Sequence, residues 1–259
     1  MKLNKLFASM VVGLAAFASS NAQANITVGG VSWDPASIID FTAQSNLYET
    51  TTGTATQTIS GYGLMTALNG DPAATFCPAC ELTYVFSGYT LTAAVNQGVG
   101  PYAGFGTGID SLTGAFSFTG GTLDVYVDPS RNFSFTNPAT ASNGTLFLSL
   151  TGDSTTYGGG ITLEGNVTGH NSNGLTGQGT GYMDVTGGLA AAYFDTNSQP
   201  GGSDFSYTSE FQAARVSTPF NAAGTNTIYG TSLPEPTSIA LLGLGLLGLG
   251  LSRRNKKAA

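Results

Sequence analysis

Short alternating runs of apolar and polar residues dominate the chain between residues 25 and 232. In one of them, Leu123, Val125 and Val127 fall on one side of an extended backbone, opposite more polar residues. This period of two is typical of a strand that buries one face. Turn-forming residues separate the runs, which predict strands at 26–33, 38–49, 56–68, 81–95, 115–119, 122–128, 144–151, 161–168, 181–186, 189–195, 204–213 and 226–230.

The clearest turn signal in this region is the glycine pair Gly120-Gly121, which separates the runs 115–119 and 122–128. Two glycines suit the positive φ angles of a two-residue turn, so the pattern predicts a β-hairpin here. Residues 169–181 are rich in glycine and asparagine, and we expect them to form a loop or a loose hairpin.

About ten to twelve short strands without long helices indicate an all-β fold. We therefore predict a single antiparallel β-sandwich or barrel-like domain over residues 25–232, which is long enough to bury a core. A β-solenoid is the alternative, although no repeat of about 20–30 residues is evident in the sequence.

Charge is scarce and strongly one-sided in this predicted domain. Only 9% of all residues are charged, against about 25% in ordinary soluble domains. Residues 25–232 contain two bases, Arg131 and Arg215, and fourteen acids, which gives a formal charge of −12. Such a surface disfavours nucleic acid as a partner. One histidine and two cysteines cannot build a four-ligand zinc site from those residue types, so we predict no metal and no cofactor.

Residues 1–24 have the three parts of a secretory signal peptide. Lys2 and Lys5 precede an apolar run at 6–18, and Ala22 and Ala24 supply the small residues of a cleavage site. An N-terminal membrane anchor is the alternative, but this run is shorter than the ~20 residues of a spanning helix. We expect the mature chain to begin at Asn25.

Residues 233–259 also consist of three parts, which we interpret as a second targeting signal. The extended, helix-breaking sequence Pro234-Glu235-Pro236 comes first. The apolar run 239–251 comes next and would span about 20 Å as a helix, against ~30 Å of bilayer core, so we expect transient insertion into the inner membrane. A basic cluster that stops translocation ends the chain: Arg253, Arg254, Lys256 and Lys257.

This tail resembles the PEP-CTERM sorting signal of Gram-negative exopolysaccharide producers. The resemblance implies recognition by exosortase, a membrane-embedded cysteine protease, and then delivery to the cell surface or extracellular matrix. A plain tail anchor is the alternative. The Leu-Pro-x-Thr-Gly pattern of sortase substrates does not fit, because Pro236 and Thr237 occupy its fourth and fifth positions.

The body resembles the flocculation-associated PEP-CTERM proteins. That family is exported and linked to floc formation, so the resemblance implies a matrix role with exopolysaccharide as partner and provides no catalytic residues. The segments that carry it are Ile26–Pro35, Phe76–Tyr84, Gly121–Tyr126 and Gly187–Asp195.

Cys77 and Cys80 form a C-x-x-C pair in an exported chain. A thioredoxin-like redox motif would need a βαβ context, and a c-type haem site would need histidine where Glu81 stands. Export favours oxidation, so we predict a structural disulfide between these two cysteines.

The remaining candidates are weaker. Asp124, Tyr126 and Asp128 share one face of a predicted strand and could contact a sugar or a cation such as Ca²⁺. His170 lies in a loop-like sequence without a Gly-x-Ser-x-Gly motif, which favours an exposed loop histidine over a catalytic base. We predict a non-enzymatic exported protein that binds exopolysaccharide and promotes cell aggregation. An exported polysaccharide-modifying enzyme with a carboxylate pair is the alternative.

Overall fold

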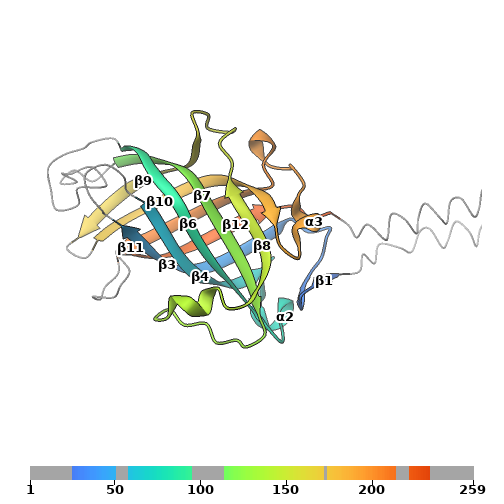
Figure 1. Ribbon diagram of the computed structural model, residues 1–259. Coiled ribbons are helices and arrows are strands. Elements are labelled where there is room, and N and C mark those ends of the chain that lie inside the picture. The colour runs from blue at the N-terminus through green and yellow to red at the C-terminus, as the bar shows by residue number, and fades with distance from the viewer. Residues whose placement is uncertain (1–24, 51–57, 95–113, 172–173, 214–221, 234–259) are drawn as a thin grey trace, which may run out of the picture.

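Antiparallel strands close into an eight-strand, barrel-like sheet, as the alternating pattern predicted (Figure 1). The computed structural model describes residues 25–50, 58–94, 114–171, 174–213 and 222–233. The predicted all-β class and its barrel-like form are confirmed.

The long strands that build the barrel are β3 (Ile39–Thr50), β4 (Thr58–Leu68), β6 (Glu81–Ala94), β7 (Gly114–Asp128), β8 (Thr145–Gly152), β9 (Ile161–Asn171), β10 (Gly174–Gly187), β11 (Phe205–Ala213) and β12 (Ala222–Gly230). The smaller elements are β1 (Ile26–Val28), β2 (Val31–Trp33), β5 (Asp71–Pro72), α2 (Ala73–Phe76), α3 (Ala191–Phe194) and the 3-10 turns η1 (Pro138–Ala141) and η2 (Pro200–Gly202).

The barrel closes because β11 pairs with β12 on one side and with β10 on the other. The order around it is β11, β12, β3, β4, β6, β7, then β8 and β9, then β10. β8 and β9 share one position between β7 and β10, each covering part of the length of these two strands. Closure removes the open edges through which a sheet could pair with another chain.

The predicted hairpin at Gly120-Gly121 is wrong, because β7 runs through both glycines without reversing. Their φ angles are 73° and 93°, so they do use the left-handed region, but within a strand. They mark the point where β7 changes its partner from β9 to β8. A glycine pair can therefore make an irregularity inside a long strand as readily as a turn.

Two other sequence predictions need correction, and for a third segment the structure decides between the two alternatives. The run 26–33 is a small hairpin of β1 and β2, because Gly29 and Gly30 have positive φ angles and reverse the chain. The run 189–195 is no strand and contains the helical turn α3. For residues 169–181, the structure shows the hairpin alternative and not the loop: they belong to β9 and β10, which pair with each other and are longer than predicted.

Aromatic rings fill the barrel where glycine leaves room on the neighbouring strand. In the pair Gly181 and Tyr207, a Cβ atom built on the glycine would lie 2.4 Å from the tyrosine ring. Covering a glycine with a cross-strand aromatic ring restores the packing that the missing side chain forfeits. The same arrangement recurs in the register-paired residues Gly63 and Tyr84, Gly165 and Phe116, and Gly230 and Phe205.

The outer wall is covered unevenly. The segment between β7 and β8 folds back over β4 and β6, where the Tyr62 hydroxyl donates to the carbonyl of Phe135 (2.7 Å) and Thr83 donates to the carbonyl of Ala141 (2.8 Å). On β10, β11, β12 and β3, the outward side chains whose burial the structure describes are exposed or half-exposed. The elements β1, α2 and α3 gather at one end of the barrel (Figure 1).

Candidate functional site

The last described residues, which lead into the C-terminal tail, are held to the barrel end that carries α3. Trp33, 3% exposed, donates its indole N–H to the Ser232 hydroxyl over 3.1 Å. Its ring stacks on Phe194, with centroids 5.1 Å apart, and meets Tyr193 edge-on at 5.7 Å. The N-terminal hairpin of β1 and β2 and the helical turn α3 thus pack around Ser232, where the chain leaves the barrel.

Backbone and hydroxyl contacts complete this junction. The backbone N–H of Leu233 donates to the carbonyl of Tyr193 over 2.7 Å. The Thr231 hydroxyl lies 3.1 Å from that of Thr196 and 2.7 Å from that of Ser198. We call these contacts, together with those of Trp33, the exit clamp.

Asp204 fixes the loop on which the exit clamp depends. Its carboxylate is 2% exposed and accepts backbone N–H groups from Thr196 (2.6 Å), Asn197 (2.7 Å) and Val185 (2.8 Å). Such charge-assisted bonds are among the stronger hydrogen bonds in proteins. This acid therefore joins β10 to the loop after α3 and has its oxygens occupied by backbone groups.

Sequence reasoning missed the exit clamp, because Trp33 and Ser232 are 199 positions apart. The sequence feature that could have pointed to this site is the single tryptophan of the chain. The sequence pattern predicts a strand at Tyr193 and Phe194, whereas they lie on α3 and supply aromatic contacts to Trp33.

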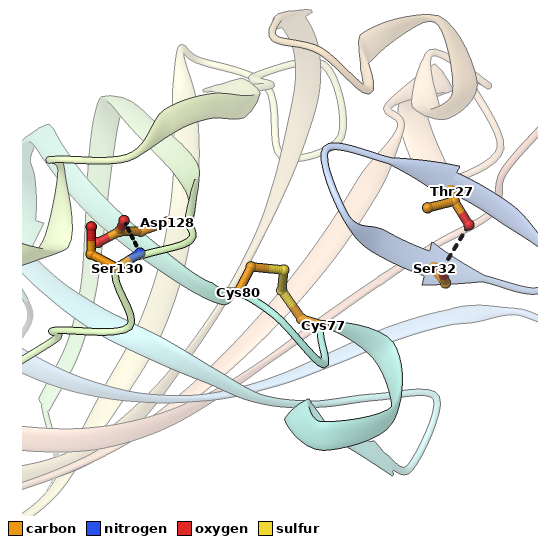
Figure 2. The surroundings of a disulfide bond; sticks show 6 residues. All are labelled: Thr27, Ser32, Cys77, Cys80, Asp128 and Ser130. Carbon is orange, nitrogen blue, oxygen red and sulfur yellow. Dashed lines mark hydrogen bonds between the residues drawn. A yellow bond between two sulfur atoms is a disulfide. The ribbon is translucent and has the colours of Figure 1, made fainter.

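Cys77 and Cys80 are joined by a disulfide with their Cα atoms 5.1 Å apart (Figure 2). The bond links the end of α2 to the start of β6, and both residues are buried, at 1% and 5% exposure. The turn of the β1–β2 hairpin lies against it, since a Cβ atom on Gly30 would be 3.5 Å from the sulfur of Cys80. This position fits a structural role.

Reduction of this disulfide should destabilise the domain only modestly. The closed loop is very short, so we expect a loss of about 2 kcal/mol or less. Thermal unfolding of the exported protein with and without reductant measures the effect. Two free thiols in non-reduced exported protein, detected by mass spectrometry, would contradict the predicted pairing.

The three candidate contact residues on β7 are placed differently from one another. Asp124 and Tyr126 are half-buried, and the Asp124 carboxylate accepts the Ser149 hydroxyl over 2.6 Å. Burial, and secondarily the Asp124 charge, raises the pKa of Tyr126. Asp128 is 2% exposed and accepts the backbone N–H of Ser130 over 2.8 Å (Figure 2). The structure therefore holds Asp128 in a turn, withdrawn from an open surface.

Several carboxyl groups have raised pKa values. Burial raises the pKa of Asp40 and of Glu81. Burial also raises the pKa of Asp184, and the neighbouring charges of Asp153 and Asp204 add to this effect. A carboxyl with a raised pKa binds its proton more tightly in the folded state, so stability falls as the pH rises through the interval between the ordinary and the raised value.

We therefore expect Asp184→Asn to stabilise the domain at pH 7 relative to the native chain. The asparagine lacks the charge that Asp153 and Asp204 repel, and the difference should vanish as the pH falls to about 4, where carboxyls protonate. Melting temperatures of both chains between these pH values test this. A matched control is Asp71→Asn, at an exposed site. A stabilisation that stays constant with pH would contradict the prediction.

The remaining residues predicted from the sequence either lie outside the described ranges or do not form a cluster of functional side chains. Ala22, Ala24, Pro234, Glu235, Pro236 and the basic cluster Arg253, Arg254, Lys256 and Lys257 lie outside the described residues. His170 falls on β9, not in a loop. Within the described ranges, no group of three or more His, Cys, Asp or Glu side chains could hold a metal ion. The same ranges contain no helix long and apolar enough to cross a membrane.

Comparison with protein families identifies the segment that continues from the exit clamp. The family model described as PEP-CTERM protein-sorting motif matches residues 232–254. The chain carries a PEP-CTERM protein-sorting motif at its C-terminal end. The PEP-CTERM motif implies export, processing by exosortase and sorting to the cell surface. It begins at Ser232, so its first two residues belong to the exit clamp. No curated protein and no solved structure is significantly similar to the chain.

Proposed function

We propose that this protein is a non-enzymatic component of the cell surface or extracellular matrix that associates with exopolysaccharide and promotes cell aggregation. The observation that carries the proposal is the PEP-CTERM motif, which starts directly at the end of a closed β-barrel. Exosortase would handle the tail at the inner membrane, where the apolar run inserts transiently. The barrel would then remain outside the cell.

Three buried acids have structural roles in the barrel, which supports a binding protein over an enzyme. Asp204 accepts three backbone N–H groups, and Asp128 and Asp153 each accept the N–H group two residues further along the chain. Carboxylates bound in this way stabilise turns. The charge of −12 on residues 25–232 repels acidic polymers, so contact with polysaccharide would depend on hydroxyl, amide and tyrosine side chains.

One observation favours the alternative of a polysaccharide-modifying enzyme. Burial and the charges of Asp153 and Asp204 raise the pKa of Asp184, and glycoside hydrolases likewise place an acid of raised pKa near a second carboxylate. Incubating the exported protein with the polysaccharide of its own cells distinguishes the two functions. We expect no new reducing ends; their release, if abolished by Asp184→Asn, would favour the enzyme.

The aggregation function is tested by deleting the gene in the producing strain. We expect dispersed cells with unchanged polysaccharide synthesis, and restored aggregation when the full chain is supplied. A chain that ends at Leu233 is the matched control, because it keeps the barrel and lacks the sorting tail; it should be exported without restoring aggregation. Normal flocculation of the deletion strain would refute the proposal, as would loss of the polysaccharide itself.

A further inference from the structure

The outer wall of β10, β11, β12 and β3 carries a regular array of uncharged side chains. The pairing of these strands places one threonine from each in a single row across the sheet: Thr180, Thr208, Thr227 and Thr42. Adjacent strands lie about 4.8 Å apart, so the row extends over roughly 14 Å. Thr180 and Thr208 are exposed, and the other two are half-exposed.

Two further rows flank the threonines. The row nearer to α3 contains two tyrosines separated by one strand: Tyr182, Ser206, Tyr229 and Asp40. The row on the other side contains amides, a carboxylate and a hydroxyl: Gln178, Glu210, Thr225 and Gln44. We call these three rows the ladder face.

A tyrosine from the loop after β8 extends this face. The Tyr157 hydroxyl lies 3.1 Å from that of Thr180, and its ring lies 5.5 Å from the ring of Tyr182. Tyr229, 39% exposed, lies two strands from Tyr182, a separation of about 10 Å. The aromatic surfaces therefore border the hydroxyl row along one side.

We propose that the ladder face binds an extended, neutral polysaccharide chain. This assignment deepens the proposed function and rests on it. Repeated hydroxyl and amide groups match the hydroxyl groups of a glycan, and tyrosine offers both an apolar ring and a hydroxyl to a sugar. Strand threonines have restricted χ1 angles, and tyrosine has few rotatable bonds, so little side-chain entropy is lost on binding.

The charges of the ladder face select among polymers. Its twelve side chains include the two acids Glu210 and Asp40 and no base, so acidic polysaccharides and nucleic acids would be repelled.

The remaining outer wall is less suitable. Part of β4 and β6 is covered by the segment between β7 and β8. On β7, Asp128 is buried and Asp124 is bonded to Ser149. Apart from its two tyrosines and two acids, the ladder face consists of eight uncharged hydroxyl or amide side chains, five of them exposed and three half-exposed. Among the half-exposed ones, Ser206 donates its hydroxyl to Gln199 over 3.2 Å. Hydroxyls cost less to desolvate than ions, which favours contact over a broad surface.

Affinity electrophoresis of the exported protein tests the assignment. We expect gels with a soluble neutral β-glucan to retard the protein, and gels with alginate, an acidic polysaccharide, to leave its migration unchanged. Thr208→Glu places a charge in the central row, and Tyr229→Ala removes an exposed ring. Each should weaken retardation about tenfold or more. Thr145→Glu, at an exposed threonine of β8, is the matched control and should bind like the native chain.

Equal retardation of the native chain and the Thr208→Glu and Tyr229→Ala chains would overturn the assignment. Absence of neutral-glucan binding would overturn it too, as would a dimer in sedimentation that Thr208→Glu dissociates, since the face would then join two copies. The proposed function is judged separately by the deletion strain. If the full chain restores aggregation there and no glucan binds, the aggregation function stands and the ladder-face assignment fails.

Discussion

Replacing Trp33 by alanine is expected to lower the free energy of unfolding by about 3–5 kcal/mol, the usual range for a large buried aromatic residue. Trp33 is 3% exposed and contacts the rings of Phe194, Tyr193 and Phe147. Its removal leaves a cavity between the N-terminal hairpin and α3. The loss is measured by denaturant or thermal unfolding, where each kcal/mol corresponds to about 2–4 °C for a domain of this size.

The matched variant Trp33→Phe separates packing from hydrogen bonding. Phenylalanine keeps an aromatic ring against Phe194 and loses the N–H group that bonds to Ser232. We expect a smaller loss of about 1–2 kcal/mol. If Trp33→Ala and Trp33→Phe destabilise equally, the aromatic cluster does not carry the stability assigned to it.

Trp33→Ala should also make the exit clamp more accessible to proteases. Ser232 would lose its indole donor and Leu233 would depend on α3 alone, through the carbonyl of Tyr193. Limited proteolysis of the full chain should therefore cut faster around residues 231–238 in Trp33→Ala than in the native protein, because local opening there costs less free energy. Unchanged cutting at this segment would show that other contacts hold the exit.

The alternating pattern predicted strands well wherever one face is buried. The run 38–49 corresponds to β3, and the run 204–213 corresponds to β11, within one residue at each end. Their inward residues include Phe41 and Phe205, which are buried as the pattern requires. Local periodicity is enough in such cases because burial of one side fixes the strand.

The pattern failed where local and long-range preferences differ. Gly120 and Gly121 have turn-like φ angles, but β6 and β8 or β9 hold β7 extended on both sides of them. Closure of the barrel could not be chosen over a sandwich from sequence, since it depends on the pairing of β10 with β11. Strand register across non-neighbouring segments has no local signal, and the threonine row depends on that register alone.

For the functional site, the C-terminal sorting motif could be predicted from the sequence, but the exit clamp that holds its first residues to the barrel could not. Pro234, Glu235 and Pro236 form a local motif, so their family could be identified without a structure. The exit clamp joins residues from both ends of the domain, and its partners become neighbours only after the barrel closes.

The second large effect is expected at Gly181 on β10. A Cβ atom at this position would lie 2.4 Å from the ring of Tyr207, on the neighbouring strand. The ring is 8% exposed and meets Tyr89 inside the barrel, with centroids 6.5 Å apart, so it has little room to move. We therefore expect Gly181→Ala to destabilise the domain by about 1–3 kcal/mol, as overpacked cores do.

Gly187 provides a control on the same strand. No atom lies within 4 Å of a Cβ built there, and its φ angle is outside the left-handed region. Gly187→Ala should be neutral or stabilise the domain by up to about 1 kcal/mol, because alanine restricts the unfolded chain. Melting temperatures of the two variants therefore shift in opposite directions, or only the first shifts. If both shift equally, a general strand preference explains the result and the ring contact does not.

A double variant tests whether the clash with Tyr207 is the cause. Tyr207→Leu alone should destabilise the domain, because it removes a ring that covers Gly181 and packs against Tyr89. Combined with Gly181→Ala, the smaller side chain leaves space for the new methyl group, so the double variant should lose less stability than the sum of the single losses. Strict additivity would show that the alanine destabilises β10 through its backbone, and would remove the steric explanation for the glycines that line this barrel.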